Sequence, residues 1–200
     1  MSEVTVVKFS QDWLSRTPTR VVAARSSFSL GVDAFAPTIN ATGPDGRFFT
    51  WLGQFQLAQK FKRGQIMFRT DVQVSKDPLL PLEKFAVGGA NSVRGYRENQ
   101  LVHDQGFVSS IEYRHSLYNS DRLGSIQIAP FVDVGGTWDV DAKTPSPHVL
   151  VATGVGLRWD PGAKLHAQLY WGYQFMHPED PGGDLQDQGI HFAVQGSFFD

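Results

Sequence analysis

The sequence contains no cysteine, so neither a disulfide nor a thiolate metal site can form. Its 18 Lys and Arg nearly balance its 20 Asp and Glu, which excludes the strongly basic surface of a nucleic-acid-binding protein. No apolar run approaches the about 20 residues that a membrane-spanning helix requires. The N-terminus also lacks an apolar signal segment, and we therefore expect a mature protein or a fragment.

The sequence does contain a repeated alternation of polar and apolar residues, which is the period of a β-strand. Within 63–75, for example, Arg69 and Asp71 alternate with Phe68 and Val72. Strong alternation covers eight segments: 19–34, 46–60, 63–75, 106–117, 123–138, 148–159, 163–175 and 187–199. A weaker alternation covers 3–15. These patterns predict an all-β chain of eight strands, or nine if 3–15 also forms one.

The length of the predicted strands separates two kinds of β protein. They reach about 12–16 residues, whereas strands average about 5–6 residues in soluble proteins and need about 9–11 to cross a membrane. Aromatic residues lie near the ends of the apolar faces: Phe48, Phe49, Trp51, Trp138, Trp159, Trp171 and Phe198. Aromatic girdles of this kind flank outer-membrane barrels. A soluble β-sandwich is the alternative, but the strand length and the charged residues in mid-strand favour a transmembrane β-barrel.

The connections between the predicted strands alternate in length. Short ones lie near 16–18, 61–63, 118–122 and 161–162, and long ones cover 35–45, 76–105, 139–147 and 177–186. Outer-membrane barrels combine short periplasmic turns with long extracellular loops. The pattern therefore predicts an antiparallel meander with a periplasmic C-terminus. It divides the chain into an N-terminal segment, 1–17, which is a strand or a periplasmic lead-in, and a barrel domain, 18–200.

Several motifs resemble a known family. The segment GGANSVRGYRE, at 88–98, resembles the lid-loop motif of the outer-membrane superfamily that includes BamA and the two-partner secretion transporters. FVDVGGTW, at 131–138, resembles the F-x-D-x-G motif on a following strand, and SSIEYR, at 109–114, is similar to the strand between them. RSSFSLG and DPLLPLEKFAVGG resemble the haemolysin secretion/activation branch. The resemblance covers about 18–200.

The resemblance implies that the long loop folds back into the barrel lumen as a lid. Its motif residues would be Val93, Arg94, Gly95 and Tyr96. Arg94 would pair with acidic residues of the inner wall, which by motif position are Glu112 and Asp133.

The alternation supports this assignment independently of the resemblance. It places Glu112 on a polar strand face, and it places Asp133 on the face that also carries Phe131 and Gly135. Gly135 has no side chain, so the loop could approach the wall closely there. The alternative is that Arg94 is a solvated turn residue.

The resemblance also bears on the number of strands. A transporter of this kind has a sixteen-stranded barrel preceded by POTRA domains, whereas we find no POTRA-like segment here. We therefore predict an all-β, antiparallel meander transmembrane β-barrel that is equivalent to the C-terminal half of such a barrel. A closed eight-stranded barrel is the alternative if 3–15 is not a strand, but its interior would be nearly filled by side chains. Two chains could also form one larger barrel, which would make the protein a homo-oligomer.

No motif in the sequence predicts enzyme chemistry or a cofactor. GVGLRW, at 154–159, lacks the third glycine of a dinucleotide-binding loop, and the acidic segment 176–187 lacks EF-hand spacing. The six His residues show no metal-binding spacing, and there is no G-x-S-x-G elbow.

The sequence thus predicts a pore component of the bacterial outer membrane rather than an enzyme. Its partners would be outer-membrane lipid and a β-rich polypeptide that is secreted or assembled through a barrel gated by the lid loop. POTRA domains outside this chain would recruit the polypeptide. A passive structural barrel or small-solute porin is the alternative, and an assembly factor similar to BamA is a third hypothesis.

Overall fold

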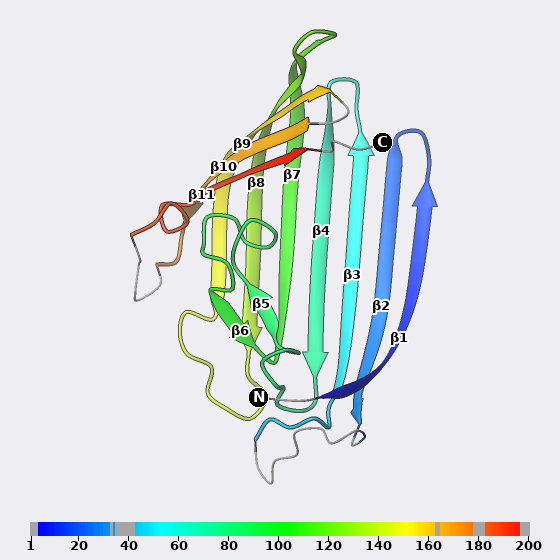
Figure 1. The fold of residues 1–200 in the computed structure, drawn as a ribbon, viewed down its shortest axis with the longest axis vertical. Coiled ribbons are helices and arrows are strands. Elements are labelled where there is room, and N and C mark those ends of the chain that lie inside the picture. Colours follow the sequence, from blue (N-terminus) through cyan, green and yellow to red (C-terminus); the bar gives the residue numbers. More distant parts are fainter. Residues whose placement is uncertain (1–3, 33, 35–42, 163–164, 178–182, 197–200) are drawn as a thin grey trace.

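The computed structural model describes residues 4–32, 34, 43–162, 165–177 and 183–196. Nine long strands form one antiparallel sheet in the order β1-β2-β3-β4-β7-β8-β9-β10-β11 (Figure 1). Their bounds are β1 Thr5–Arg16, β2 Arg20–Val32, β3 Phe49–Lys60, β4 Gly64–Ser75, β7 Gln105–Ser120, β8 Gly124–Trp138, β9 Val149–Gly162, β10 Leu165–Gln174 and β11 Ile190–Gly196. The described residues form no helix, and so none that is long and apolar enough to cross a membrane. The predicted all-β antiparallel meander is confirmed.

The weak alternation near the N-terminus forms a full strand. β1 pairs with β2 along its whole length. The paired residues run from Thr5 and Val32 at one end to Arg16 and Val21 at the other. Its pattern is weak because polar Gln11 stands on the face that also carries Phe9 and Trp13. The doubtful strand at 3–15 is therefore present, and the sheet has nine long strands in the described part of the chain.

The described sheet is open and is not a closed barrel, so the alternative of a closed eight-stranded barrel is wrong, whereas part of a larger barrel would also be open. β1 and β11 lie at its two edges and do not pair with each other among the described residues. An odd number of antiparallel strands makes the first and the last strand run in the same direction. The antiparallel closure of bacterial outer-membrane barrels, which have even strand numbers, is therefore not available to these nine strands.

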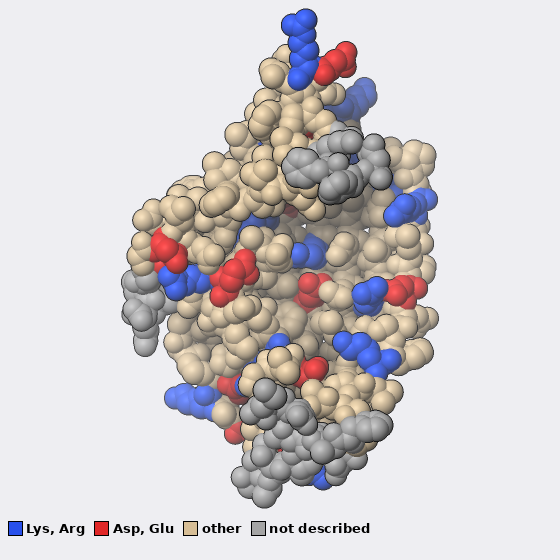
Figure 2. Space-filling view, viewed as in Figure 1, with Lys and Arg blue, Asp and Glu red and all other residues tan. Residues whose placement is uncertain are grey.

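The two faces of the sheet invert the burial pattern of a soluble protein. On β7 and β8, Ile111 and Val132 are each 48% exposed, whereas the adjacent acids Glu112 and Asp133 are only 5% and 0% exposed. We call the face that carries Glu112 and Asp133 the lid face, and the face that carries Ile111 and Val132 the outer face. Figure 2 shows basic and acidic residues close together across the middle of the molecule. Exposed apolar side chains on the outer face suit contact with lipid rather than with water.

The long connection between β4 and β7, residues 76–104, lies over the lid face, in front of β7 and β8 in Figure 1. We call it the lid segment. It contains a short antiparallel hairpin, β5 (Phe85–Val87) and β6 (Leu101–His103), which the sequence prediction treated as loop. Strands of three residues are too short to show a period. The buried core lies where this segment meets the sheet and consists of Val87, Val93, Tyr96, Leu101, Val108, Leu150 and Ala152.

The residues of the predicted aromatic girdle differ in exposure. Trp159 and Trp171 are 40% and 50% exposed on the outer face, the face on which a girdle residue would lie. Phe48 is only 3% exposed, because it lies just before β3 and packs where a side chain at Gly31 would otherwise stand. Phe198 lies outside the described residues.

Candidate functional site

The guanidinium of Arg94 is held by groups from β7 and β8. Its Nε donates to Asp133 Oδ2 at 2.8 Å, and its Nη2 donates to Asp133 Oδ1 at 2.9 Å, which makes a two-point ion pair. Its Nη1 donates to a carboxylate oxygen of Glu112, and Nη2 also donates to Ser110 Oγ at 3.0 Å. The backbone N–H of Arg94 adds a bond to Asp133 Oδ2 at 3.0 Å. Arg94 thus contacts both acids that the sequence predicted.

Two aromatic rings complete the surroundings of Arg94. Its Cζ lies 3.8 Å from the ring centroid of Phe131 and 4.9 Å from that of Tyr170. The two rings are themselves in edge contact, with centroids 5.9 Å apart. A cation is attracted to the face of an aromatic ring, so these rings favour the charged guanidinium in a place with little water. Phe131 is therefore one wall of the Arg94 site.

Burial makes the charges of this site interdependent. Arg94 is 7% exposed, Glu112 5% and Asp133 0%. Burial alone would lower the pKa of Arg94, but the hydrogen bonds and charges of Asp133 and Glu112 outweigh it and raise the pKa. Arg114 also donates to Glu112, so the two carboxylates face two guanidinium groups. A buried ion pair of this kind costs solvation free energy, and it is stable only while every partner is present.

The next motif residue, Gly95, brings the lid segment into backbone contact with β10. Its φ of +102° lies in the left-handed region, where glycine is favoured. Its N–H donates to His191 Nε2 at 3.1 Å, and its carbonyl accepts a bond from the Gln174 amide. A Cβ on Gly172 would lie 2.8 Å from the Gly95 Cα, so neither position has room for a side chain.

The side chain of Tyr96, the next motif residue, packs against Val108, Leu150 and Ala152 of the sheet and is fully buried. Its hydroxyl donates to the Val151 carbonyl at 2.8 Å and accepts from the Met176 N–H at 3.0 Å. Burial raises the pKa of Tyr96, because the ionised phenol would lose its solvation. Tyr96 thus ties the lid segment to β9 and to the end of β10.

Val93 and Gly135 form the apolar side of the same contact. Val93 is 0% exposed. A Cβ on Gly135 would lie 2.7 Å from Val87 Cγ1 and 3.0 Å from Val93 Cγ2. The missing side chain of Gly135 therefore admits both valines to the wall, in agreement with the close approach expected from the sequence.

A further ion pair at this end of the lid segment was not predicted. Arg97 Nη2 donates to Asp184 Oδ2 at 2.7 Å and to Asp187 Oδ2 at 3.0 Å. The sequence predicted only a long connection at 177–186, of which residues 178–182 lie outside the described residues. The only available signal was the complementary charge of a basic motif and an acidic loop almost 90 residues later.

A second unpredicted cluster fixes the base of the lid segment. Lys84 Nζ lies 3.2 Å from Asp104 Oδ1 and 3.2 Å from Asp139 Oδ1. His103 Nδ1 lies 2.8 Å from Asp139 Oδ2. Asp104 also accepts the backbone N–H of Leu79 at 2.9 Å. The lid segment is thus bound by charge at both its base and its tip.

The contacts of Arg94 form an ion-pair network. The residues that the structure describes include no group of three His, Asp or Glu that could hold a metal ion. The arrangement holds the tip of the lid segment against the sheet.

The chain matches a model of a known protein family over most of its length. Residues 2–159 match the family model described as haemolysin secretion/activation protein ShlB/FhaC/HecB. No curated protein sequence matches the chain.

Solved structures share the fold at low identity. CdiB from Escherichia coli is 18% identical with a TM-score of 0.77, covering 96% of this chain and 36% of that one. CdiB from Acinetobacter baumannii is 17% identical with a TM-score of 0.69, covering 94% of this chain and 32% of that one. BamA from Haemophilus ducreyi lacking POTRA domains 1–3 is 11% identical with a TM-score of 0.67, covering 94% of this chain and 42% of that one. This chain therefore spans about a third of the length of the CdiB chains.

Proposed function

Because the chain belongs to the haemolysin secretion/activation family, we propose that it forms part of an outer-membrane pore that secretes a partner polypeptide. This is a family of transporters and not of enzymes. The family and the structural relatives support an outer-membrane location and a β-barrel architecture. The apolar outer face, with side chains such as Leu157 and Leu169 about half exposed, supports contact with lipid.

The lid segment is proposed to close this pore. The observation that carries the proposal is the buried ion pair of Arg94 with Asp133 and Glu112, which binds the tip of the lid segment to the wall. Breaking it would free the tip to move and would open a path along the lid face. A passive porin needs no guanidinium enclosed by two carboxylates, so this feature favours a gated transporter.

A reversible cross-link tests whether the lid segment must move. The chain has no cysteine, so Val93→Cys and Gly135→Cys would introduce the only two thiols. A Cβ at Gly135 would lie 3.0 Å from Val93 Cγ2, within reach of a disulfide, and 2.7 Å from Val87 Cγ1, so every variant also carries Val87→Ala to make room for the new side chain. We expect the complete pore that contains the oxidised chain to show few channel openings in a planar lipid bilayer, and we expect a reducing agent to restore them.

The two single-cysteine variants are the matched controls, since each carries the same substitution without the cross-link. They should conduct equally with and without oxidant. Equal conductance of the oxidised and the reduced double variant, with the disulfide verified by mass spectrometry, would refute the gating role of the lid segment.

A further inference from the structure

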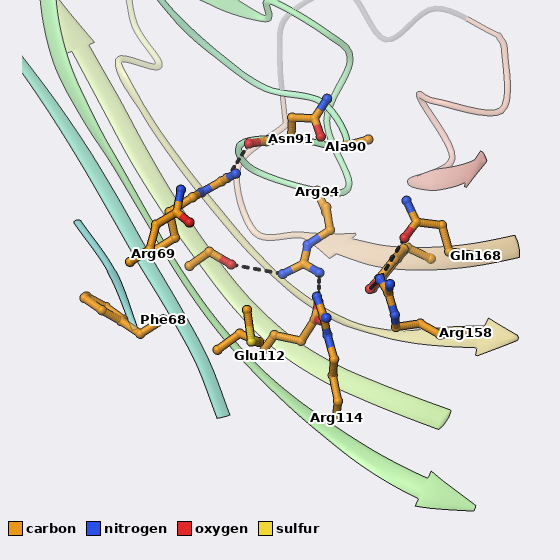
Figure 3. Close-up of a pocket in the computed structure, with 13 residues that line it drawn as sticks. Phe68, Arg69, Ala90, Asn91, Arg94, Glu112, Arg114, Arg158 and Gln168 are labelled. Carbon is orange, nitrogen blue, oxygen red and sulfur yellow. Dashed lines mark hydrogen bonds and ion pairs between the residues drawn. The ribbon is translucent and has the colours of Figure 1, made fainter. Parts of the chain in front are cut away.

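A pocket of about 280 Å³ on the lid face is lined by four arginines (Figure 3). Arg94 comes from the lid segment, Arg69 from β4, Arg114 from β7 and Arg158 from β9. Glu112 is the only carboxylate residue that lines it within the described part of the chain. The lining is therefore strongly basic, although the protein as a whole carries a slight negative charge.

Two of these arginines have no acidic partner among the residues that the structure describes. Arg158 Nη1 donates to Gln168 Oε1 at 2.8 Å and to the Tyr170 hydroxyl at 3.2 Å, and both acceptors are neutral. Arg69 Nη2 donates to the backbone carbonyl of Asn91. Asp133 and Glu112 are already occupied by Arg94 and Arg114. Positive charge at Arg69 and Arg158 is therefore left uncompensated.

One donor in the pocket also lacks any partner. The Nε of Arg69 is buried and has no hydrogen bond to the described residues. A buried donor without an acceptor is unfavourable, and it is more so when the donor is charged. The side chain of Arg69 would be stabilised by an acceptor that carries negative charge.

We propose that this pocket binds an anionic group, a carboxylate or a phosphate. Guanidinium groups from β4, β7 and β9 can each offer two parallel N–H donors to such a group. Gln168 and the Tyr170 hydroxyl hold Arg158 in place and so fix one of these donors before an anion arrives. The inference does not depend on secretion, because it rests on the charge and the donors of the pocket alone.

The position of the pocket favours a source in the lumen over membrane lipid. Arg69 and Arg158 stand on the lid face, on the opposite side of the sheet from exposed apolar residues such as Leu157 and Leu169. The anion would therefore be a free phosphate or the acidic side chain of a polypeptide that lies against the lid face.

Peptide binding to the purified protein in detergent tests the proposal. The probes are a fluorescent tetraglutamate peptide and a matched tetraglutamine peptide, with binding followed by anisotropy. We expect tetraglutamate to bind at least about tenfold more tightly, with an affinity that falls as salt rises. The double variant Arg69→Gln/Arg158→Gln should raise the Kd for tetraglutamate about tenfold or more.

Two further variants separate loss of the site from loss of the fold or of general charge. Arg69→Lys/Arg158→Lys keeps both charges and should bind better than the glutamine pair. Arg122→Gln removes an exposed arginine from the turn between β7 and β8 and should leave the Kd unchanged. Far-UV circular dichroism verifies that each variant is folded.

Inorganic phosphate identifies the source of the anion. Displacement of tetraglutamate by phosphate would show a general anion site, and resistance to phosphate would show a site that selects carboxylates; either result supports the proposal. Equal binding of the two peptides, or equal loss of binding in Arg122→Gln and in the glutamine pair, would overturn it.

Discussion

Arg94 is enclosed by groups that suit a charged guanidinium and little else. Asp133 binds it at two points, Glu112 binds a third nitrogen, and the Phe131 ring lies 3.8 Å from its Cζ. The two acids are almost fully buried, so Arg94 supplies charge compensation that water cannot supply there. Removing Arg94 would leave the buried Asp133 without its cationic partner, whereas Glu112 would keep Arg114.

Arg94→Ala should therefore detach the lid segment. Loss of one partner of a buried ion pair costs about 3–5 kcal/mol, and this cost should fall on the seated state of the lid segment more than on the sheet. Hydrogen exchange followed by mass spectrometry should show faster exchange in 88–98 while β7 and β8 remain protected.

Arg94→Lys is the matched control, since it keeps the charge but lacks the planar fork. It should protect 88–98 better than Arg94→Ala and less well than arginine. Unchanged exchange in Arg94→Ala would show that the ion pair does not hold the lid segment.

The resemblance implied the pairing of Arg94 with Glu112 and Asp133, and the alternation of the strands supported only the faces of the two acids. The alternation of β7 and β8 places Glu112 and Asp133 on one face because side chains alternate across a strand. The partners of Arg97 could not be predicted in this way, because Asp184 and Asp187 lie in an irregular segment without a period. Neither could the ring of Tyr170 beside Arg94, since its position depends on how the sheet curves around the lid segment.

At the scale of elements, the lid segment is fixed at its base by Lys84, Asp104 and Asp139. Partial burial raises the pKa of Asp139, but the hydrogen bonds from Lys84 and His103 outweigh it, so the pKa is lowered overall. A carboxyl whose pKa is lowered by folding stabilises the folded state above its ordinary pKa. That stabilisation is lost as the pH falls through the lowered pKa.

We therefore expect the base of the lid segment to loosen in acid, below the ordinary pKa of Asp139, which is 3.8. Trp138 precedes Asp139 and stacks on Phe107, so its fluorescence should report the change. In Asp139→Asn the base of the lid segment should be held less firmly at neutral pH. The variant should also lack the part of the acid transition that is due to Asp139. An identical acid titration of Asp139→Asn and the unaltered protein would contradict the assignment.

The base cluster marks a limit of sequence reasoning about elements. The long strands follow from their period, and the predicted bounds of β4, 63–75, differ by only one residue from the observed Gly64–Ser75. Lys84 and Asp139 are 55 residues apart and meet only because β7 and β8 fold back on each other. No local pattern marks such a pair.

At the scale of the whole molecule, the outer face should determine where the protein is stable. Leu169 stands on β10 and is 50% exposed. Arginine at a lipid-facing position near the middle of the bilayer destabilises a membrane barrel by about 2–4 kcal/mol. Leu169→Arg should therefore lower the free energy of unfolding in lipid vesicles by about this amount.

The control is Leu169→Ala, which shortens the side chain without adding charge and should cost less. Unfolding by guanidinium chloride, followed by tryptophan fluorescence, measures both variants. If Leu169→Arg is no less stable than Leu169→Ala in vesicles, the outer face does not lie in the bilayer.

The sequence left two alternatives, part of a larger barrel or a closed barrel of eight strands, and the open sheet excludes the closed barrel. Whether edges close depends on the pairing of β1 with β11, which lie at opposite ends of the described chain. Period-two patterns specify each strand and its inward face, but they carry no information on which edges meet. The parity of the strand number, nine, became known only when β1 proved to be a strand.

The contacts of the lid tip fall on strands that come late in the sequence. Arg94 binds residues of β7 and β8, Tyr96 binds Val151 of β9, and Gly95 binds His191 of β11. Contacts between residues far apart in the chain form late, because ordering the chain between them costs entropy. The tip can therefore take its full set of partners only after β11 has joined β10. A seated tip thus distinguishes a sheet that β11 has joined from one that it has not, and the segment proposed to close the pore also reports the docking of β11.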